Sequence, residues 1–170
     1  MDIARTAPRS RQAGVTLIES LITMAVSVVA LGAAVPGFES ARERRHLEGT
    51  VAQLETDLQY ARSLAVAANQ TLRVSFGNNA AGSCYTISHA PITDASCLHG
   101  DLRAVQLAPE FLSLSASAAS MAFDPAKGTV TPTSTVEVRS RSGHAVRVVV
   151  NVMGRVRSCS PSGLPGFKAC

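Results

Sequence analysis

Two arginines near the C-terminus have the type and spacing needed to bind a polyanion. Arg155 and Arg157 are two residues apart, so in an extended segment their side chains point to the same side. A guanidinium group matches phosphate oxygens with two parallel hydrogen bonds. No acidic residue follows Glu137 in the chain, which favours attraction to DNA through counterion release. The alternative interpretation is a solvated strand end whose arginines keep the domain soluble.

Cysteines enclose the tail that follows these arginines. The chain has four: Cys84, Cys97, Cys159 and Cys170. An even number without CxxC spacing predicts disulfides in an oxidising compartment rather than a redox or zinc motif. Three pairings are possible, and we favour Cys84–Cys97 and Cys159–Cys170 because short loops are easy to close. The second bond would limit the freedom of a tail rich in Pro and Gly, and could hold Lys168 near the arginines.

A second pattern lies at the N-terminus. Residues 1–14 form a basic leader, and residues 15–35 form an apolar run. A helix over this run would be about 30 Å long, which is the thickness of the hydrocarbon core of a bilayer. A signal peptide has its small-residue cleavage site after the apolar run, whereas here the small residue, Gly14, precedes the run. Cleavage after Gly14 would therefore remove the charge and leave the apolar helix in place.

Glu19 is the one ionisable residue in the apolar run. A carboxylate is costly in hydrocarbon, so its presence indicates a function or a partner. If Val15 becomes the N-terminus, Glu19 can pair with the α-amino group of a neighbouring subunit, which lowers the cost of burying both charges. The alternative is a plain membrane anchor whose Glu reaches the interface.

Composition limits the functions that the chain can have. It has 170 residues, 46% hydrophobic residues and a formal net charge of +4, which suits one domain with an appendage. The absence of Trp and an aromatic content of 4% argue against an aromatic ligand box or a base-stacking platform. No nucleotide-binding or hydrolase motif is present, and the histidines lack the spacing of metal ligands. We therefore expect no enzyme, no cofactor and no metal site.

The pattern of the remaining chain predicts an α+β fold. Pro36 and Gly37 interrupt the helical pattern, and an apolar stripe then predicts a helix over 38–68 that packs on a β head. Short β-like runs follow, at 71–76, 84–89, 102–107, 111–115, 119–123, 129–131, 135–141 and 144–152. The last two form the clearest hairpin. The predicted divisions are a leader at 1–14, an apolar helix at 15–35, an amphipathic stem at 36–70 and a β-rich head at 71–170.

The segment Gly-Val-Thr-Leu-Ile-Glu, which begins at Gly14, resembles the class III leader junction of type IV pilins and type II secretion pseudopilins. The resemblance implies a long N-terminal helix, kinked at Pro36, packed on an antiparallel head. It also implies that a prepilin peptidase cuts after Gly14 and methylates the amine of Val15, where the family usually has Phe. Glu19 would then guide docking into a growing filament.

The segment Gly154-Arg155-Val156-Arg157 resembles the GRxR motif of FimT-type minor pilins, which bind DNA during natural transformation. Those proteins share one family with the type II secretion pseudopilin GspH. By this resemblance Arg155 and Arg157 contact DNA. Nothing in the sequence resembles a groove-reading helix, so binding would depend little on DNA sequence. Other cations match no motif and are included only as basic neighbours: Arg139, Arg141, Arg147 and Lys168.

The resemblance implies a minor type IV pilin that assembles into a pilus and binds extracellular double-stranded DNA for uptake. Its partners would be double-stranded DNA, other major and minor pilins, prepilin peptidase and the inner membrane. Before assembly the chain would cross the inner membrane once with its head in the periplasm, and afterwards it would lie in the extracellular pilus near the tip. The alternatives are a GspH-like pseudopilin and a minor pilin that primes assembly without binding DNA.

Overall fold

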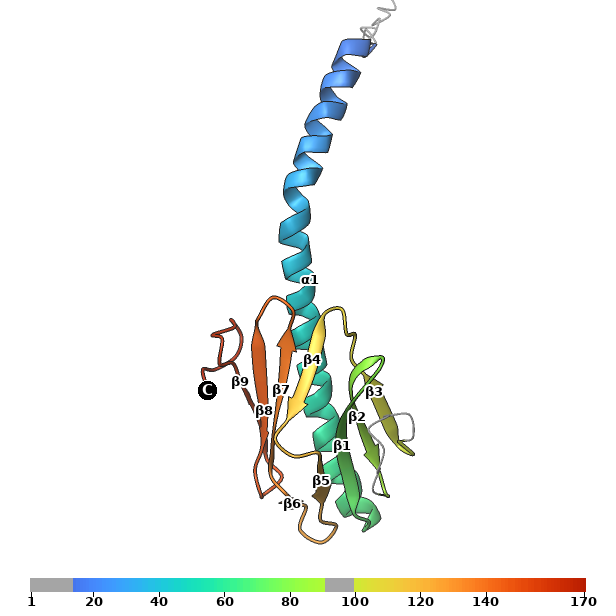
Figure 1. The fold of residues 1–170 in the computed structure, drawn as a ribbon, viewed down its shortest axis with the longest axis vertical. Helices are drawn as coiled ribbons and strands as arrows, with labels where there is room; N and C mark the ends of the chain where they lie inside the picture. The colour runs from blue at the N-terminus through green and yellow to red at the C-terminus, as the bar shows by residue number, and fades with distance from the viewer. Residues whose placement is uncertain (1–13, 91–99) are drawn as a thin grey trace, which may run out of the picture. The chain divides into compact units, whose positions relative to one another are not determined.

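The computed structural model describes residues 14–90 and 100–170, apart from the side chains of residues 34–36. The chain divides into two compact units, Met1–Glu39 and Ser40–Cys170. Helix α1 (Leu17–Ala68) begins in the first unit and ends in the second (Figure 1). Thr16 caps its start, because the Glu19 amide donates to Thr16 Oγ1 at 3.4 Å, as is typical of an N-cap residue.

The first unit presents apolar side chains to its surroundings. Large hydrophobic residues from Leu17 to Leu31 are exposed, and α1 contains a window apolar enough to cross a membrane. The helix runs unbroken through Pro36 and Gly37, so the interruption predicted there is wrong. A proline removes one N–H donor, and the helical hydrogen bonds on either side are enough to continue the helix. The kink predicted at Pro36 is a bend of the helix axis rather than a break in the helix, and it stays a prediction.

The amphipathic half of α1 lies in the second unit and confirms the predicted stripe. All its members are buried: Leu47, Val51, Leu54, Leu58, Ala61 and Ala65. The helix ends in a Schellman motif, in which the Gln70 amide donates to the Ala65 carbonyl at 3.1 Å and the Asn69 amide donates to the Val66 carbonyl at 3.3 Å. Asn69 has a φ of 51°, and Asn is one of the few residues other than Gly that accepts this conformation.

The strands of the second unit form two antiparallel sheets. One sheet has the order β3-β2-β1-β5-β6 and the other has the order β4-β7-β8-β9 (Figure 1). Their bounds are β1 Leu72–Asn79, β2 Gly82–Ser88, β3 Arg103–Gln106, β4 Leu112–Ala116, β5 Ser120–Phe123, β6 Val130–Thr131, β7 Ser134–Ser140, β8 Ala145–Val150 and β9 Val156–Cys159. Each predicted run is therefore a strand, and the α+β prediction is confirmed. The β9 strand was not predicted.

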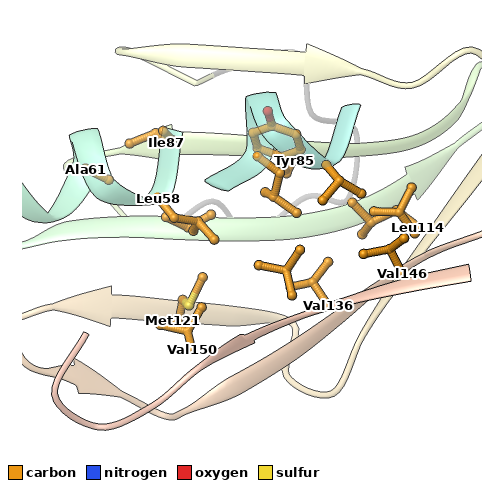
Figure 2. Packing of buried hydrophobic residues seen from close by; sticks show 14 of the residues in the cluster. Leu58, Ala61, Tyr85, Ile87, Leu114, Met121, Val136, Val146 and Val150 are labelled. Carbon is orange, nitrogen blue, oxygen red and sulfur yellow. The ribbon is translucent and has the colours of Figure 1, made fainter. Parts of the chain in front are cut away.

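One hydrophobic core joins the helix stripe to both sheets. Figure 2 shows members of this core from α1 (Leu58 and Ala61), from the first sheet (Ile87) and from the second sheet (Val136). The sheets are also joined by a buried hydrogen bond, since the Leu114 amide of β4 donates to Ser83 Oγ of β2 at 2.9 Å. Every residue of this core lies between Leu47 and Leu164. Residues 40–170 therefore contain a complete core of their own.

A buried polar cluster fixes α1 against the first sheet. Asp57 of the helix is 3% exposed. Its Oδ2 accepts a hydrogen bond from the Tyr85 hydroxyl at 2.7 Å and forms an ion pair with Arg103 Nε at 2.9 Å. Burial, followed by the bond to Asp57, raises the pKa of Tyr85 far above its usual value. The phenol thus remains a donor, and the buried carboxylate keeps the partners that it needs.

Candidate nucleic-acid interface

Strand alternation on β7 and β8 separates core residues from surface residues. Val136, Val138 and Ser140 of β7 are buried, and so are the residues of β8 that continue the apolar face, Val146, Val148 and Val150. The intervening positions face away from the core and include Glu137, Arg139 and Arg147. Val152, which was predicted on the apolar face, is 54% exposed, because β8 ends at Val150 and a turn follows.

Arg155 and Arg157 lie at this turn and on the strand after it. The turn is closed by the Gly154 amide, which donates to the Asn151 carbonyl at 2.8 Å. The Arg155 amide donates to Asn151 Oδ1 at 2.9 Å, and Arg157 pairs with Val149 in the β8–β9 ladder. The residues that follow the last predicted strand, 144–152, therefore include a further strand, β9, at the edge of the second sheet.

Both motif arginines are exposed, and within the described residues neither forms an ion pair with a carboxylate. Val156 between them is half buried against the core. Only Arg157 lies on β9 itself, so the common side expected for residues two apart in an extended segment stays a prediction. Two exposed guanidinium groups without carboxylate partners among the described residues can bind phosphate oxygens without first releasing an internal partner.

Unlike Arg155 and Arg157, Arg139 and Arg147 both form ion pairs with Glu137. Arg147 Nε donates to Glu137 Oε2 at 2.7 Å, and Arg139 Nη2 donates to Glu137 Oε1. The Arg147 bond and, after it, the Arg139 contacts hold the pKa of Glu137 below its usual range, against the opposing effect of burial. Glu137 therefore neutralises part of the charge that the sequence assigned to this face.

Lys168 and Arg141 lie away from the turn that carries Arg155. The Ser160 amide donates to the Lys168 carbonyl at 2.8 Å, so Lys168 is beside the end of β9, whereas Arg155 precedes its start. Arg141 lies at the β7–β8 turn, where its amide donates to the Phe111 carbonyl at 3.0 Å. Both side chains are exposed. The structure thus spreads the predicted cations over the length of the sheet.

The disulfide between Cys159 and Cys170 is present, as predicted. It closes a tail that is attached at further points, since Leu164 is buried in the core and Arg44 Nη2 of α1 donates to the Pro165 carbonyl at 3.1 Å. Cys84 is buried and is not free. Its predicted partner, Cys97, lies outside the described residues, so that pairing stays a prediction.

Gly154 has a steric role in this interface. Its φ is +68°, and a Cβ at this position would lie 2.5 Å from the Gly128 carbonyl oxygen and 2.9 Å from Arg62 Nε. The Arg62 Nε in turn donates to the Gly128 carbonyl at 3.1 Å. The glycine of the motif therefore allows the β8–β9 turn to approach α1 and the β5–β6 loop. The sequence carried no sign of this contact, which joins distant segments.

The N-terminal candidate residues lie at the start of α1. Gly14 and Val15 precede the helix, and Glu19 is in its first turn. All three are exposed in the first unit. A carboxylate in the first turn stabilises a helix by its interaction with the helix dipole, so Glu19 has a local structural role in addition to the one that the sequence suggested.

A long N-terminal helix packed on antiparallel sheets, with an apolar first half, defines a type IV pilin fold. A family model described as Type II transport protein GspH matches residues 50–154, and a model described as prokaryotic N-terminal methylation motif matches residues 9–35. The chain therefore belongs to the GspH family of minor type IV pilins and pseudopilins.

Solved structures have the same fold. The type IV minor pilin FimU of Pseudomonas aeruginosa has a TM-score of 0.53 and 21% identity, over 74% of this chain and 96% of FimU. The minor pseudopilin EpsH from the Type 2 Secretion System of Vibrio cholerae has a TM-score of 0.52 and 15% identity, over 69% of this chain and 98% of EpsH. A comparison with curated protein sequences gives no match. The methylation motif implies processing by prepilin peptidase.

Proposed function

We propose that this chain is a minor type IV pilin that binds extracellular double-stranded DNA non-specifically for uptake in natural transformation. The observation that carries the proposal is the exposure of Arg155, at the turn before the edge strand β9, and of Arg157, on β9, both without carboxylate partners among the described residues. Arg147, Arg139, Arg141 and Lys168 add charge to the same sheet and its ends. Binding of this kind depends on phosphate contacts and weakens as salt increases.

The same proposal assigns roles to the rest of the chain. Residues 1–14 are a leader removed after Gly14, and residues 15–35 are the membrane and filament-core helix. Residues 36–70 are the stem and residues 71–170 are the head. Methylation of Val15 follows cleavage, and Glu19 positions the subunit during assembly. The head begins in the periplasm and ends in the pilus, near its tip.

The experiment that tests DNA binding uses oxidised residues 40–170, which have a complete core. Fluorescence anisotropy of a labelled duplex is measured as a function of salt for the wild-type head and for the Arg155→Ala/Arg157→Ala variant. Arg42→Ala/Arg45→Ala, on α1, removes the same number of positive charges elsewhere. We expect salt-sensitive binding that is lost in the first variant and retained in the second. No binding by the folded wild-type head at low salt would contradict the proposal.

A second candidate function is supported by the family model, whose description names type II transport. In that case the chain is a pseudopilin, or a minor pilin that primes assembly without binding DNA. Deletion of the gene, complemented with Arg155→Ala/Arg157→Ala, separates the candidates in cells. The DNA-binding function requires normal pili with lost transformation, whereas the structural functions require the variant to restore every phenotype.

A further inference from the structure

A cleft of about 740 Å³ opens beside the first arginine of the GRxR segment. It is lined by residues of α1 between positions 59 and 67, by residues 126–128 of the β5–β6 loop, and by residues 154–156. All of these lie in the second unit. A cleft of this size can hold a small ligand or one repeating element of a polymer.

Among the described residues, three cations and no carboxylate line the cleft: Arg62, Lys127 and Arg155. Arg62 is half buried, and its Nε is anchored on the Gly128 carbonyl at 3.1 Å. The terminal nitrogens of this guanidinium have no hydrogen-bond partner within the described part of the chain. Lys127 and Arg155 are exposed and can move toward a ligand. The cleft thus combines one oriented donor with two adaptable ones.

The nearest carboxylate along the chain already has partners. Asp124 Oδ1 accepts hydrogen bonds from the amides of Ala126 and Lys127, at 3.0 and 2.9 Å. Its backbone carbonyl accepts a bond from the Gly128 amide at 2.9 Å. Asp124 therefore shapes the loop that carries Lys127 and is not one of the residues that line the cleft.

We propose that this cleft binds a backbone phosphate of double-stranded DNA, and that Arg62 and Lys127 extend the interface begun by Arg155. This inference rests on the proposed function, because Arg155 belongs to both surfaces. Oriented Arg donors beside a Lys charge suit a phosphate group. The described residues that line the cleft include no aromatic side chain on which a base could stack. The occupant is therefore the sugar-phosphate backbone, which agrees with sequence-independent binding.

Lys127→Glu tests the inference, because the side chain is exposed and makes no contact that the fold requires. In anisotropy titrations of the 40–170 head with a labelled duplex, we expect roughly tenfold weaker binding at low salt. The reason is that the substitution replaces a positive charge beside the phosphate by a negative one. The slope of log affinity against log salt should also fall by about 1, as for the loss of one phosphate contact. Arg45→Glu, an exposed cation outside the cleft, is the matched control.

A second measurement locates the DNA without a substitution. In amide NMR spectra of the wild-type head, the Gly128 and Gly154 signals should shift on addition of the unlabelled duplex, because both residues line the cleft. The inference is overturned if Lys127→Glu binds DNA as tightly as the wild-type head, or as tightly as Arg45→Glu. The proposed DNA binding by Arg155 and Arg157 still holds in that case if Arg155→Ala/Arg157→Ala abolishes binding. Absence of binding by the wild-type head overturns both.

Discussion

Arg147 on β8 donates its Nε proton to Glu137 Oε2 on β7 at 2.7 Å, directly across the strand pair. The carboxylate that accepts this bond is the last acidic residue of the chain. It lies on the face that also carries Arg139. The interface therefore contains a built-in competitor for the phosphate groups that we propose it binds.

Removal of that competitor should strengthen DNA binding. In Glu137→Gln, Arg147 and Arg139 lose their ionic partner and become free to contact phosphate, so we expect affinity to rise about threefold to tenfold at low salt. Anisotropy titration of the 40–170 head measures the effect. Glu110→Gln, an exposed carboxylate on the β3–β4 connection, makes the same change in net charge. Equal affinities of the two variants would show that only net charge matters.

The same ion pairs should make stability depend on pH. The contacts with Arg147 and Arg139 lower the pKa of Glu137 in the folded state, whereas in the unfolded chain it is about 4.3. Their stabilising effect is present above that pH and is lost as pH falls through the lowered folded value. The Asp101 pKa is lowered by its hydrogen bond with His89, which acts in the same direction. Thermal unfolding of the wild-type head should therefore shift to lower temperature below about pH 4.

Glu137→Gln separates the contribution of Glu137 from that of Asp101, because the Gln amide does not titrate. Its unfolding temperature should depend less on pH between about pH 5 and pH 3 than that of the wild-type head. Identical pH profiles for the two proteins would mean that the Glu137 pairs contribute nothing to stability.

Tyr85→Phe should destabilise the second unit through the buried Asp57. The variant removes the hydroxyl donor at 2.7 Å and leaves Arg103 as the remaining side-chain partner, so we expect a loss of about 1–2 kcal/mol in the free energy of unfolding. Denaturant titration measures it. The control is Tyr60→Phe, because Tyr60 is 51% exposed and its hydroxyl has no bond in the described residues. A loss of the same size in Tyr60→Phe would refute this explanation.

Gly154→Ala should cost more stability than the same change at Gly163. The two glycines have nearly equal φ values, +68° and +69°, but a Cβ at Gly163 would have no neighbour within 4 Å. We expect Gly163→Ala to lose about 1 kcal/mol for the backbone conformation alone. Gly154→Ala should lose about 3 kcal/mol, because the β8–β9 turn must also move away from the Gly128 carbonyl. Chemical denaturation of both variants provides the comparison, and equal losses would exclude the steric contribution.

Much of the fold was predictable because its elements have clear periods. The apolar stripe on α1 and the alternation along β7 and β8 each define one buried face. The β9 strand was missed because it is short and has one large apolar residue, Val156. An edge strand with exposed arginines gives no alternation that distinguishes it from a loop. Its pairing with β8 is a tertiary property that the local sequence does not encode.

The candidate site was predictable only where its residues are neighbours in the sequence. The spacing of Arg155 and Arg157 predicts a common side, and the structure places Arg155 in the turn before β9 and Arg157 on β9. The pairing of Glu137 with Arg147 depends on strand register, and the approach of Arg62 to Gly154 depends on how α1 packs. Neither contact produces a pattern in the local sequence, because each joins residues that are distant in the chain. Prediction from the sequence therefore found the cations but not which of them are neutralised or which share a cleft.

The contact between Gly154 and the Gly128 carbonyl has a consequence for the comparison of sequences. The GRxR segment then combines two separate requirements. The close approach of the turn requires the glycine, and the DNA binding that we propose requires the arginines. A related chain that no longer binds the ligand but keeps the turn should retain the glycine, whereas its two arginines should be replaced by other residues. Glycine alone at this position would then indicate the head architecture, and the two arginines would be the part of the segment that reports on the DNA binding that we propose.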